Sequence, residues 1–442
     1  MTQHTASERT AVRRVAVIGS GVAGLTAAWV LAGSAEVTLY EAAPRLGGHA
    51  DTHRVTAGNG EIIGVDTGFI VFNDRTYPTL LRLFGELGIA TKDCDMSMSV
   101  RCDGCGLEYA GARGAAGLFA TPRSLVRGRY LRLLAEVPRW HRLARALLDS
   151  DQENNRTLGE FVREAGFSRY FITHFLTPLV AAVWSCDPAT ALRYPARYLC
   201  TFLDHHGMLT VFGSPTWRTV TGGSATYVRA ITDRLDHVLI GTPVRAVHRR
   251  PDAVVVRDDA DDVRVFDAAV IATHPGQALE ILAEPTEAER EILAAMPYSV
   301  NHTLLHTDSS VLPRARQARA CWNYRLPSCT TPADRVLVSY DLTRLQRLEH
   351  TGERRFLVTL NGEDRVAPHT VLDRMVYEHP SYTPDSVAAQ RRLGEIGSTR
   401  LAFAGAYHGW GFHEDGAASG LRAAQRLGAR WSAQLPAPVS TS

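Results

Sequence analysis

The sequence predicts an α/β protein: a Rossmann-like domain into which a second, α+β domain is inserted. Three observations carry this prediction. The β-branched run 15–18 leads into a glycine-rich turn at 19–24, and apolar residues then recur at helical spacing along 25–31. Strand and glycine-turn patterns of the same kind return at 220–224, 268–274 and 401–420. Residues 76–212, between the first glycine turn and the one at 220–224, carry mostly the apolar spacing of amphipathic helices.

The glycine-rich turn has the spacing Gly-x-Gly-x-x-Gly. Gly19 permits a tight turn, Gly21 lets the backbone approach a pyrophosphate, and Gly24 lets the following helix pack on the strand. The phosphates would lie over the free N–H groups at the helix N-terminus, where the helix dipole favours an anion. Gly19, Gly21, Ala23 and Gly24 are therefore expected to bind a dinucleotide.

A second strand, residues 36–40, ends at Glu41, twenty residues after Gly21. A carboxylate here can accept both hydroxyl hydrogens of an adenosine ribose, and it disfavours a 2′-phosphate. The pair Gly47–Gly48 follows and resembles the second glycine element of a large flavoprotein superfamily that includes amine oxidases and phytoene desaturases. That resemblance implies FAD rather than NAD, with Gly47, Gly48 and His49 at the cofactor.

Composition limits the function classes. The chain has 442 residues, 45% of them hydrophobic, which is enough for two domains with sizeable cores. A net charge of +2 without a concentrated basic stripe gives no reason to expect a nucleic-acid partner. No stretch reaches about eighteen consecutive apolar residues, and residues 1–14 contain no signal-peptide h-region. We therefore expect a cytoplasmic protein with no transmembrane segment, for which peripheral membrane contact stays open.

The cysteine pattern favours no metal. Seven cysteines, an odd number, are typical of a reducing compartment. Cys102 and Cys105 form a C-x-x-C pair that could be a redox pair or half of a zinc site. No second C-x-x-C or H-x-x-x-H pair accompanies it in the sequence. We therefore expect a turn between strands with incidental thiols, and no metal site.

The inserted region reads as mostly helical. Helices are expected at 78–87, 130–148 and 157–162, and at 171–184, which is apolar nearly all round and so is buried or lines an apolar cavity. After the glycine turn at 222–223 we expect a helix at 225–235, strands at 238–240, 244–247 and 268–274, and a hairpin of 253–256 with 263–266. A helix at 287–295 and strands around 303–306, 335–340 and 356–360 follow.

The cofactor-binding signals divide the chain. We expect a discontinuous FAD-binding domain of residues 12–75, 213–284 and 379–432, a substrate domain of residues 76–212 and 285–378, a disordered tail at 1–11 and a second tail at 433–442. Gly68 and Phe69 lie in the stretch 64–72, which in the superfamily it resembles approaches the isoalloxazine. In the same stretch Asp66 more plausibly caps a turn. Val244 matches the position whose backbone pairs with adenine, and Thr273 belongs to an A-T-G-like element.

The last cofactor segment runs from Gly405 to a helix within 411–420. A helix N-terminus aimed at flavin N1 and the C2 carbonyl would stabilise reduced flavin. We expect Gly416 and Ala417 to supply the N–H groups. Glu414 is expected at the cofactor, although a cap or dipole partner at the helix start is the better single explanation for it and for Asp415. His413 is a candidate for proton transfer.

Longer stretches resemble a narrower group. Residues 65–73, 182–185, 202–207, 217–224, 322–324 and 411–416 resemble bacterial NAD/FAD-binding amine-oxidase-like proteins often associated with cyclopropane-fatty-acid synthase. The resemblance covers nearly the whole chain. It implies a cofactor domain of p-hydroxybenzoate-hydroxylase type and an amine-oxidase-like substrate domain. Some members of the group are linked to desaturation of methyl-branched fatty acyl chains, so the resemblance also implies an acyl-lipid substrate.

These features predict a two-electron oxidation of an apolar substrate by hydride transfer to flavin N5, with molecular oxygen or another acceptor taking the electrons. Abundant aromatic residues would suit an alkyl chain: Phe175, Trp184, Phe202, Trp217, Trp322, Tyr324, Tyr407 and Trp410. His413, His206 and Tyr340 are candidates for the base that removes the adjacent proton, as is His205.

Three alternative functions stay open. These are amine or amino-acid oxidation, a redox-neutral flavin isomerase, and a non-catalytic flavin-binding protein. Many amine oxidases place a lysine beside flavin N5 from a late strand of the substrate domain. The single lysine here, Lys92, is early in the chain.

Overall fold

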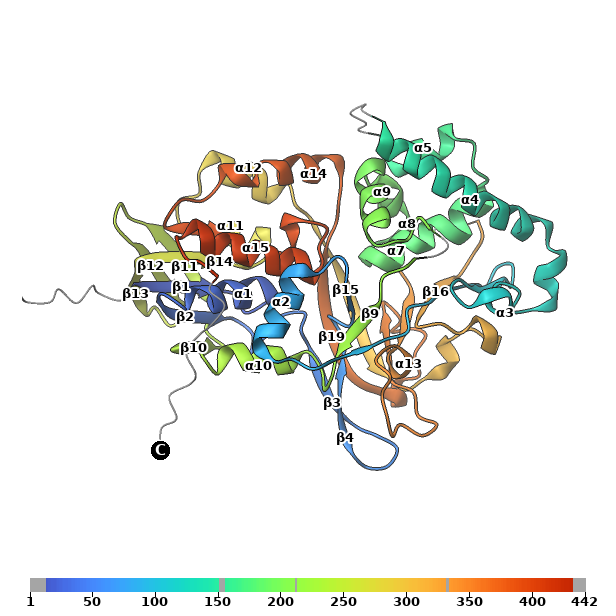
Figure 1. Cartoon of the computed structure of the whole chain (residues 1–442), viewed down its shortest axis with the longest axis horizontal. Helices are drawn as coiled ribbons and strands as arrows, with labels where there is room; N and C mark the ends of the chain where they lie inside the picture. Colours follow the sequence, from blue (N-terminus) through green and yellow to red (C-terminus); the bar gives the residue numbers. More distant parts are fainter. Residues whose placement is uncertain (1–12, 151–155, 211–212, 331–333, 432–442) are drawn as a thin grey trace, which may run out of the picture.

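The computed structural model describes residues 13–150, 156–210, 213–330 and 334–431, and the predicted tails 1–11 and 433–442 lie outside them. Two regions lie side by side (Figure 1). One contains a parallel sheet and the glycine turn, and the other contains a larger sheet covered by helices. The predicted α/β fold with an inserted α+β region is confirmed.

The parallel sheet has five strands in the order β10-β2-β1-β14-β20. They are β1 (Arg14–Ile18), β2 (Glu36–Glu41), β10 (His237–Ile240), β14 (Ala268–Ile271) and β20 (Leu401–Phe403). Successive residues of β1 face opposite cores: Val15 and Val17 pack with α1 (Val22–Leu31) and α15 (His413–Arg426), and Ala16 and Ile18 face the other side. Burial on both faces explains why these strands read as continuous apolar runs.

Smaller elements surround this sheet. The second face carries the sheet of β11 (Val244–Arg249), β12 (Val254–Asp258) and β13 (Val263–Phe266), with α11 (Pro275–Ile281) and α12 (Glu287–Ala294). Nearby are α2 (Pro78–Leu87), α10 (Ala225–Thr232), the hairpin of β3 (Thr52–Thr56) with β4 (Ile62–Asp66), and the sheet of β5 (Phe72–Asn73), β9 (Trp217–Val220) and β6 (Thr91–Asp93).

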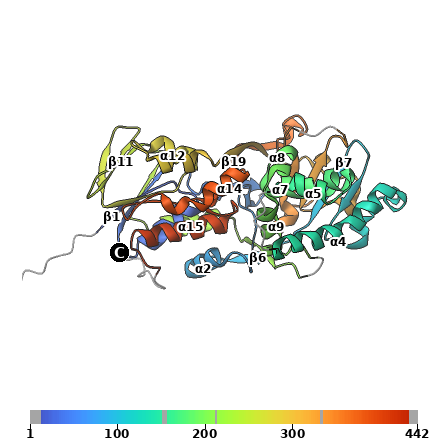
Figure 2. The same cartoon turned by 90° about the horizontal axis from the view of Figure 1, so that it is seen from above.

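The second sheet has seven strands in the order β19-β15-β18-β17-β16-β7-β8. They are β7 (Met98–Cys102), β8 (Glu108–Ala110), β15 (Tyr298–His306), β16 (Trp322–Leu326), β17 (Val338–Asp341), β18 (Leu357–Leu360) and β19 (Val371–Pro380). All neighbours are antiparallel except β16 and β7, which are parallel. Figures 1 and 2 place β19 at the junction of the two regions.

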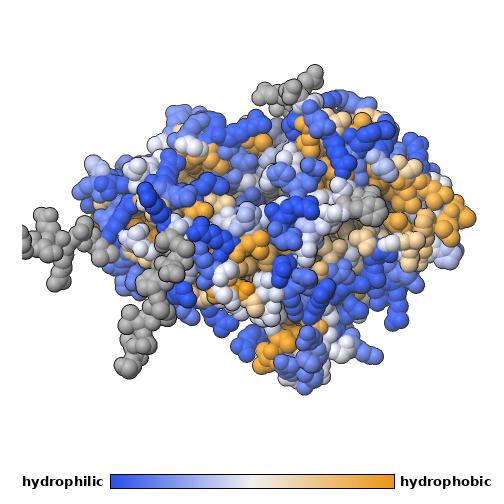
Figure 3. Space-filling model, in the orientation of Figure 1, coloured by the Kyte–Doolittle hydropathy of each residue, from blue (hydrophilic) through white to orange (hydrophobic). Residues whose placement is uncertain are grey.

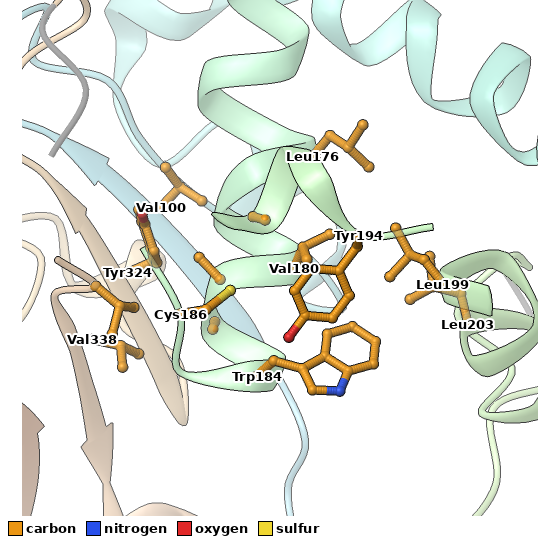
Figure 4. Packing of buried hydrophobic residues seen from close by; sticks show 14 of the residues in the cluster. Val100, Leu176, Val180, Trp184, Cys186, Tyr194, Leu199, Leu203, Tyr324 and Val338 are labelled. Atoms are coloured by element: carbon orange, nitrogen blue, oxygen red, sulfur yellow. The ribbon is translucent and has the colours of Figure 1, made fainter. Parts of the chain in front are cut away.

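A helical layer covers the second sheet. It comprises α4 (Gly128–Asp149), α5 (Leu158–Glu164), α6 (Arg169–Phe171), the π-helical turn η2 (Ile172–Leu176), α7 (Thr177–Trp184), α8 (Pro188–Arg193) and α9 (Ala196–His205). Figure 4 shows Leu176, Val180 and Trp184 of this layer in one core with Val100, Tyr324 and Val338 of the strands. The remaining short helices are α3 (Gly114–Leu118), η1 (Pro122–Val126), η3 (Ser309–Val311), η4 (Arg316–Ala318), α13 (Leu342–Leu345), η5 (Pro368–Thr370), α14 (Pro384–Arg391), η6 (Leu393–Glu395) and η7 (Ala406–His408).

Several elements differ from the sequence predictions. The stretch predicted as mostly helical also contains β6, a strand of three residues that is too short to show an alternation. β7 and β8 lie on either side of the Cys102–Cys105 turn, where a turn between strands was predicted. β17 begins at Val338 rather than at 335, and β15 extends back to Tyr298. β19 was not predicted, because the strand lies at the sheet edge and most of its first six residues are exposed, namely Leu372, Asp373, Arg374 and Val376.

The predicted domain boundaries remain a proposal. The five strands of the parallel sheet fall within 12–75, 213–284 and 379–432, and those of the second sheet fall outside these segments except for the last two residues of β19. Within the described residues, no helix combines the length and the apolar character needed to cross a bilayer.

Candidate functional site

The glycine turn after β1 is shaped by close backbone contacts. Gly19 has a φ of +101°, and a Cβ on it would lie 2.7 Å from the carbonyl oxygen of Ala272, just past β14. A Cβ on Gly24 would lie 1.9 Å from the carbonyl oxygen of Gly19. Both glycines are thus required by the turn and by the packing of α1 on the sheet, the steric roles that their spacing predicts.

Gly21 differs because its surroundings are open. Its φ of −64° and ψ of 172° suit any residue, and a Cβ on it would meet no atom within 4 Å. Gly21 precedes the first turn of α1, which has no acidic residue and no side-chain cap among the described residues. The first N–H groups of a helix have no partner within the helix, and the dipole is positive there. The turn therefore fits a pyrophosphate.

Glu41 and Ser20 connect the two glycine elements. The Glu41 carboxylate accepts the backbone N–H of Ser20 at 3.0 Å and that of Ala43 at 2.8 Å. The Ser20 hydroxyl also donates to Glu41 and accepts the N–H of Gly47 at 3.0 Å. A carboxylate has about four acceptor positions, and three are used here, so Glu41 keeps capacity for about one ribose hydroxyl. Ser20 was not predicted, because a serine inside a glycine turn has no pattern of its own.

A cleft of ≈ 660 Å³ runs from the glycine turn into the inserted region. This volume is typical of ligand sites. The cleft is lined by most of the predicted site residues: Gly19, Gly21, Ala23, Glu41, Gly48, His49, Gly68, Phe69, Val244, Thr273, Gly405, His206, Tyr340 and His413. Gly24 and Gly47 are not on the cleft wall. They support it, since a Cβ on Gly47 would lie 2.5 Å from the Ala50 carbonyl oxygen.

Three buried polar atoms of cleft-lining residues have no hydrogen-bond partner in the described chain: His49 Nε2, Trp322 Nε1 and the Tyr407 hydroxyl. An unpaired buried polar group costs about 1–3 kcal/mol. Burial lowers the pKa of His49 well below its usual value, so its imidazole is neutral near pH 7. These atoms fit a bound molecule that brings its own polar groups, as FAD does.

The start of α15 differs from the sequence prediction. The helix begins at His413, so the Gly416 N–H already donates to the Phe412 carbonyl oxygen at 3.1 Å. Gly416 and Ala417 are buried, and a Cβ on Gly416 would lie 2.6 Å from Val22 Cγ1. The prediction that these two residues offer free N–H groups is therefore wrong, and they pack α15 against α1. The sequence alone does not distinguish a glycine that permits close helix packing, such as Gly416, from a glycine that approaches a ligand.

Glu414 does not line the cleft. Its carboxylate accepts the N–H groups of Thr79 and Leu80, each at 3.0 Å. These groups belong to the first turn of α2, where backbone donors lack partners within the helix. The expected cofactor contact is thus wrong, and Glu414 caps a helix that is distant in sequence.

Replacing Glu414 by alanine is expected to lower the free energy of unfolding by about 1–2 kcal/mol, because two backbone N–H groups lose their acceptor. Bound FAD should stay at the wild-type level. Urea denaturation and flavin absorbance measure the two quantities. Glu353→Ala, at an exposed position, is the control and should change neither. A protein that loses FAD without losing stability would contradict this role.

Of the four predicted proton-transfer residues, His205 does not line the cleft, and His413, Tyr340 and His206 line it with hydrogen-bond partners already in place. His413 Nε2 lies 3.0 Å from the Tyr227 hydroxyl, and its ring stacks on Phe69 with centroids 3.6 Å apart. The Tyr340 hydroxyl donates to the Ala182 carbonyl oxygen at 3.4 Å. Burial lowers the pKa of His413 to about 3 and raises that of Tyr340, so both groups are neutral near pH 7.

His206 has a defined acceptor nitrogen. Its Nδ1 lies 3.0 Å from the Phe202 carbonyl oxygen, which can only accept, so we assign the ring hydrogen to Nδ1. Nε2 therefore carries a lone pair, and it lies 3.2 Å from the Thr76 hydroxyl. Burial lowers the pKa of His206 to about 4, so the ring is neutral near pH 7.

The end of the cleft in the inserted region is apolar. We call it the apolar chamber and define it by Ala182, Val183, Trp184, Phe202, Met208, Trp322, Tyr340 and Leu360. Ring centroids of Trp184 and Phe202 lie 4.6 Å apart, and those of Trp322 and Tyr340 lie 5.2 Å apart. Of the aromatic residues predicted here, Trp184, Phe202, Trp217, Trp322 and Tyr407 line the cleft, whereas Phe175, Tyr324 and Trp410 do not.

β19 contributes residues to the cleft that were not predicted from the sequence. Tyr377, Glu378 and His379 line it, and Glu378 Oε2 lies 2.8 Å from Nδ1 of His274. The Tyr377 hydroxyl donates to the Asp51 carboxylate at 2.7 Å. The one available signal was the run of Tyr, Glu and His itself, because the exposed outer half of this strand hides its periodicity.

A parallel sheet with this glycine turn, an acidic residue after its second strand, and a cleft that continues into a second sheet is the architecture of a dinucleotide-dependent oxidoreductase. The sequence pattern of the flavin containing amine oxidoreductase family matches residues 22–428. The chain belongs to this family, and its cofactor is FAD. The predicted family, cofactor and enzyme class are confirmed.

Individual proteins match this chain either over a short stretch or at low sequence identity. A stretch of 43 residues is 56% identical to L-amino-acid oxidase from Pseudechis australis, and it spans 10% of this chain and 8% of that protein. Cyclohexylamine oxidase from Brevibacterium oxydans IH-35A has a TM-score of 0.68 and 17% identity, covering 94% of this chain and 98% of its own. The CLA-producing fatty acid isomerase from P. acnes has a TM-score of 0.66 and 16% identity, covering 92% and 97%. These structural similarities show the fold.

Proposed function

We propose that this oxidoreductase dehydrogenates an apolar, acyl-lipid-like substrate. The apolar chamber carries the proposal: the carboxylates that line the cleft are Glu41, Glu280 and Glu378, and none of them lies on an element that contributes a chamber residue. An alkyl chain gains about 0.8 kcal/mol for each CH₂ that leaves water. An ammonium group would enter the same space without a counter-ion, which is strongly unfavourable.

Bound FAD supplies the chemistry by accepting a hydride and hence two electrons from the substrate. A double bond forms only if one substrate carbon loses a hydride and the adjacent carbon loses a proton. We assign that proton to Nε2 of His206, the candidate whose hydrogen bonds define an acceptor nitrogen. His413 and Tyr340 line the cleft and shape the substrate site. Molecular oxygen or another acceptor would then take the two electrons.

Ligand binding to the oxidised protein tests the proposal without requiring turnover. Fatty acyl amides of increasing length are titrated while the flavin spectrum is followed. The Kd should fall roughly threefold to fourfold for each added CH₂ until the chamber is filled. Alkylammonium ions of the same lengths should bind far more weakly. Equal affinity of the two series, or no dependence on length, would contradict the proposal.

Amine oxidation is the second candidate, and membership of the family favours it. Lys92, the only lysine in the chain, lies on β6, and its Nζ donates to the Arg347 carbonyl oxygen at 3.1 Å. It does not line the cleft. An amine oxidase built on this chain would thus work without a lysine at the flavin. Redox-neutral isomerisation and flavin binding without turnover are the remaining alternatives.

A peripheral membrane contact fits one end of the inserted region. We call the segment 113–132, which contains α3 and η1, the apolar tip. Leu125, Val126 and Leu131 are 56%, 83% and 41% exposed there, and Figure 3 shows hydrophobic surface at this end of the molecule. The same segment contains five arginines and no acidic residue: Arg113, Arg123, Arg127, Arg129 and Arg132. Apolar side chains among cations suit an anionic bilayer surface.

Replacing Val126 by aspartate is therefore expected to reduce binding to vesicles of phosphatidylglycerol and phosphatidylcholine at least about tenfold, through lost burial and charge repulsion. Co-sedimentation measures it. Val263→Asp is the matched control, because Val263 is 55% exposed on β13 in the other region. Vesicle binding that is absent in wild type, or equal in the two variants, would contradict a membrane contact at the tip.

We further propose a cytoplasmic location, since none of the seven cysteines forms a disulfide.

A further inference from the structure

Four side chains that suit a soft metal converge at a place remote from the cleft wall. They are Cys102, Cys105, His174 and Cys329, and their ligand atoms all lie within 4.8 Å of one another. The Sγ atoms of Cys102 and Cys329 are 3.3 Å apart, and Cys105 Sγ lies 3.7 Å from His174 Nε2. None of the four lines the cleft, so the cofactor chemistry does not account for them.

The sheet brings three of these residues together. Cys102 ends β7, and Cys105 lies in the tight turn that follows, closed by the Gly106 N–H donating to the Cys102 carbonyl oxygen at 2.8 Å. β16 runs parallel to β7 and delivers Cys329 three residues beyond its end at Leu326. Gly104 allows this approach, because a Cβ on it would lie 3.0 Å from the Cys329 backbone nitrogen.

The helical layer supplies the fourth residue. His174 is buried on η2, the π-helical turn between α6 and α7. Such turns occur frequently at functional sites. The His174 Nδ1 lies 3.1 Å from the Tyr170 carbonyl oxygen, which fixes the hydrogen on Nδ1 and leaves Nε2 free as a ligand facing the thiols. Ring stacking on Tyr170, with centroids 3.9 Å apart, also holds this orientation.

The spacing of the ligand atoms suits a tetrahedral site. Zn–S bonds of about 2.3 Å and Zn–N bonds of about 2.0–2.1 Å place tetrahedral ligand atoms about 3.5–3.8 Å apart. The separations of 3.3 Å between Cys102 and Cys329 and of 3.7 Å between Cys105 and His174 lie close to that range. All four ligand atoms lie within 4.8 Å of one another, so any longer separation would shorten when the metal binds. The sulfur atoms of Cys102 and Cys329 are also farther apart than the length of about 2.05 Å of a disulfide bond.

We propose that Cys102, Cys105, His174 and Cys329 bind one Zn²⁺ in a closed structural site that fastens the helical layer to the edge of the second sheet. Three thiolates and Zn²⁺ carry a net negative charge, and Arg127 Nη1 lies 3.6 Å from Cys105 Sγ, where it offsets that charge. Binding releases the three thiol protons to solvent. Four protein ligands leave no open position, which makes the role structural.

This proposal replaces the sequence-based expectation of no metal. That expectation used the spacing of one C-x-x-C pair and the lack of a second pair. The missing ligands are single residues separated from Cys105 by 69 and 224 positions, a spacing that no local pattern can reveal.

The test measures metal in the FAD-loaded protein, purified without chelator from zinc-supplemented cells. Elemental analysis should find about one zinc per chain. Cys105→Ser and His174→Ala should each reduce it at least about tenfold, whereas the control Cys94→Ser, at a partly exposed cysteine outside the group, should leave it unchanged. Flavin content reports folding of each variant.

A second measurement keeps the test decisive if a variant fails to fold. Wild-type protein in which Co²⁺ replaces zinc should show the intense visible bands of tetrahedral cobalt and a thiolate-to-cobalt charge-transfer band. Folded, flavin-loaded wild-type protein that contains no zinc and gives no such bands would overturn the proposal. A Cys102–Cys329 or Cys102–Cys105 disulfide found by mass spectrometry in that protein would also overturn it.

Discussion

Gly21→Val is expected to fold like the wild type and to bind FAD at least about 100-fold more weakly. Valine suits the φ of −64° and ψ of 172° at this position, and its Cβ would meet no protein atom within 4 Å. The side chain would instead fill the space in front of the first turn of α1. Loss of two charge-assisted hydrogen bonds to phosphate corresponds to about 3–6 kcal/mol, or roughly 10²- to 10⁴-fold in Kd.

Apoprotein titration with FAD gives the Kd, and circular dichroism with thermal denaturation checks the fold. Gly85→Val is the matched control, because a Cβ on Gly85 in α2 also meets no atom within 4 Å and this residue does not line the cleft. Gly24→Val should behave differently and fail to fold, since its Cβ would lie 1.9 Å from a carbonyl oxygen. Wild-type affinity in folded Gly21→Val would show that the pyrophosphate lies elsewhere.

The second prediction concerns Asp66, a buried carboxyl at the end of β4 that is 1% exposed. Its carboxylate accepts the backbone N–H of Ser224 at 2.8 Å and the hydroxyl groups of Ser224 and Thr52 at 2.7 and 2.5 Å. No arginine, lysine or histidine of the described chain forms an ion pair with it. Burial therefore raises the pKa of Asp66 from 3.8 to about 6.

The raised pKa of Asp66 determines how the folding stability changes with pH. The folded state holds the proton more tightly than the unfolded state, so the stabilisation is complete below about pH 3.8 and is lost as the pH rises through about 6. A shift of this size corresponds to about 3 kcal/mol. Asp66→Asn cannot ionise, so its stability relative to wild type should rise by about 2–3 kcal/mol between about pH 4.5 and pH 7.5.

Urea denaturation of the apoprotein at several pH values measures this difference. Asp252→Asn is the control, because it makes the same substitution in the exposed turn between β11 and β12, where no buried carboxyl is removed. A constant difference between wild type and Asp66→Asn would show that Asp66 is ionised throughout and stabilised by its three hydrogen bonds.

Local chemistry explains which parts of the site could be predicted from sequence. The turn from Gly19 to Gly24 and the carboxylate of Glu41 need only neighbouring residues and the register of two adjacent strands, so their spacing is sufficient. Glu414, Gly416 and Ala417 were misassigned because their partners, the first turn of α2 and Val22, are distant in sequence.

Convergence of distant residues is the part that sequence patterns do not show. Tyr377 and Glu378 reach the cleft on an edge strand whose outer half is exposed. Cys329 and His174 approach Cys105 only because β16 pairs in parallel with β7 and because a π-helical turn holds the histidine there. Resemblance to the family supplied the cofactor and the fold, and three aromatic residues of the apolar chamber, Trp184, Phe202 and Trp322, were predicted from the sequence. The arrangement of the chamber and the cysteine–histidine group required the structure.

The substrate class can be read from the anaerobic absorption spectrum of the FAD-loaded protein, recorded as acyl lipids, amines and amino acids are added in turn. Saturated acyl lipids should bleach the oxidised flavin and yield an unsaturated chain, and amines and amino acids should leave the spectrum unchanged. Bleaching by amines or amino acids while acyl lipids have no effect would contradict the proposed acyl-lipid substrate.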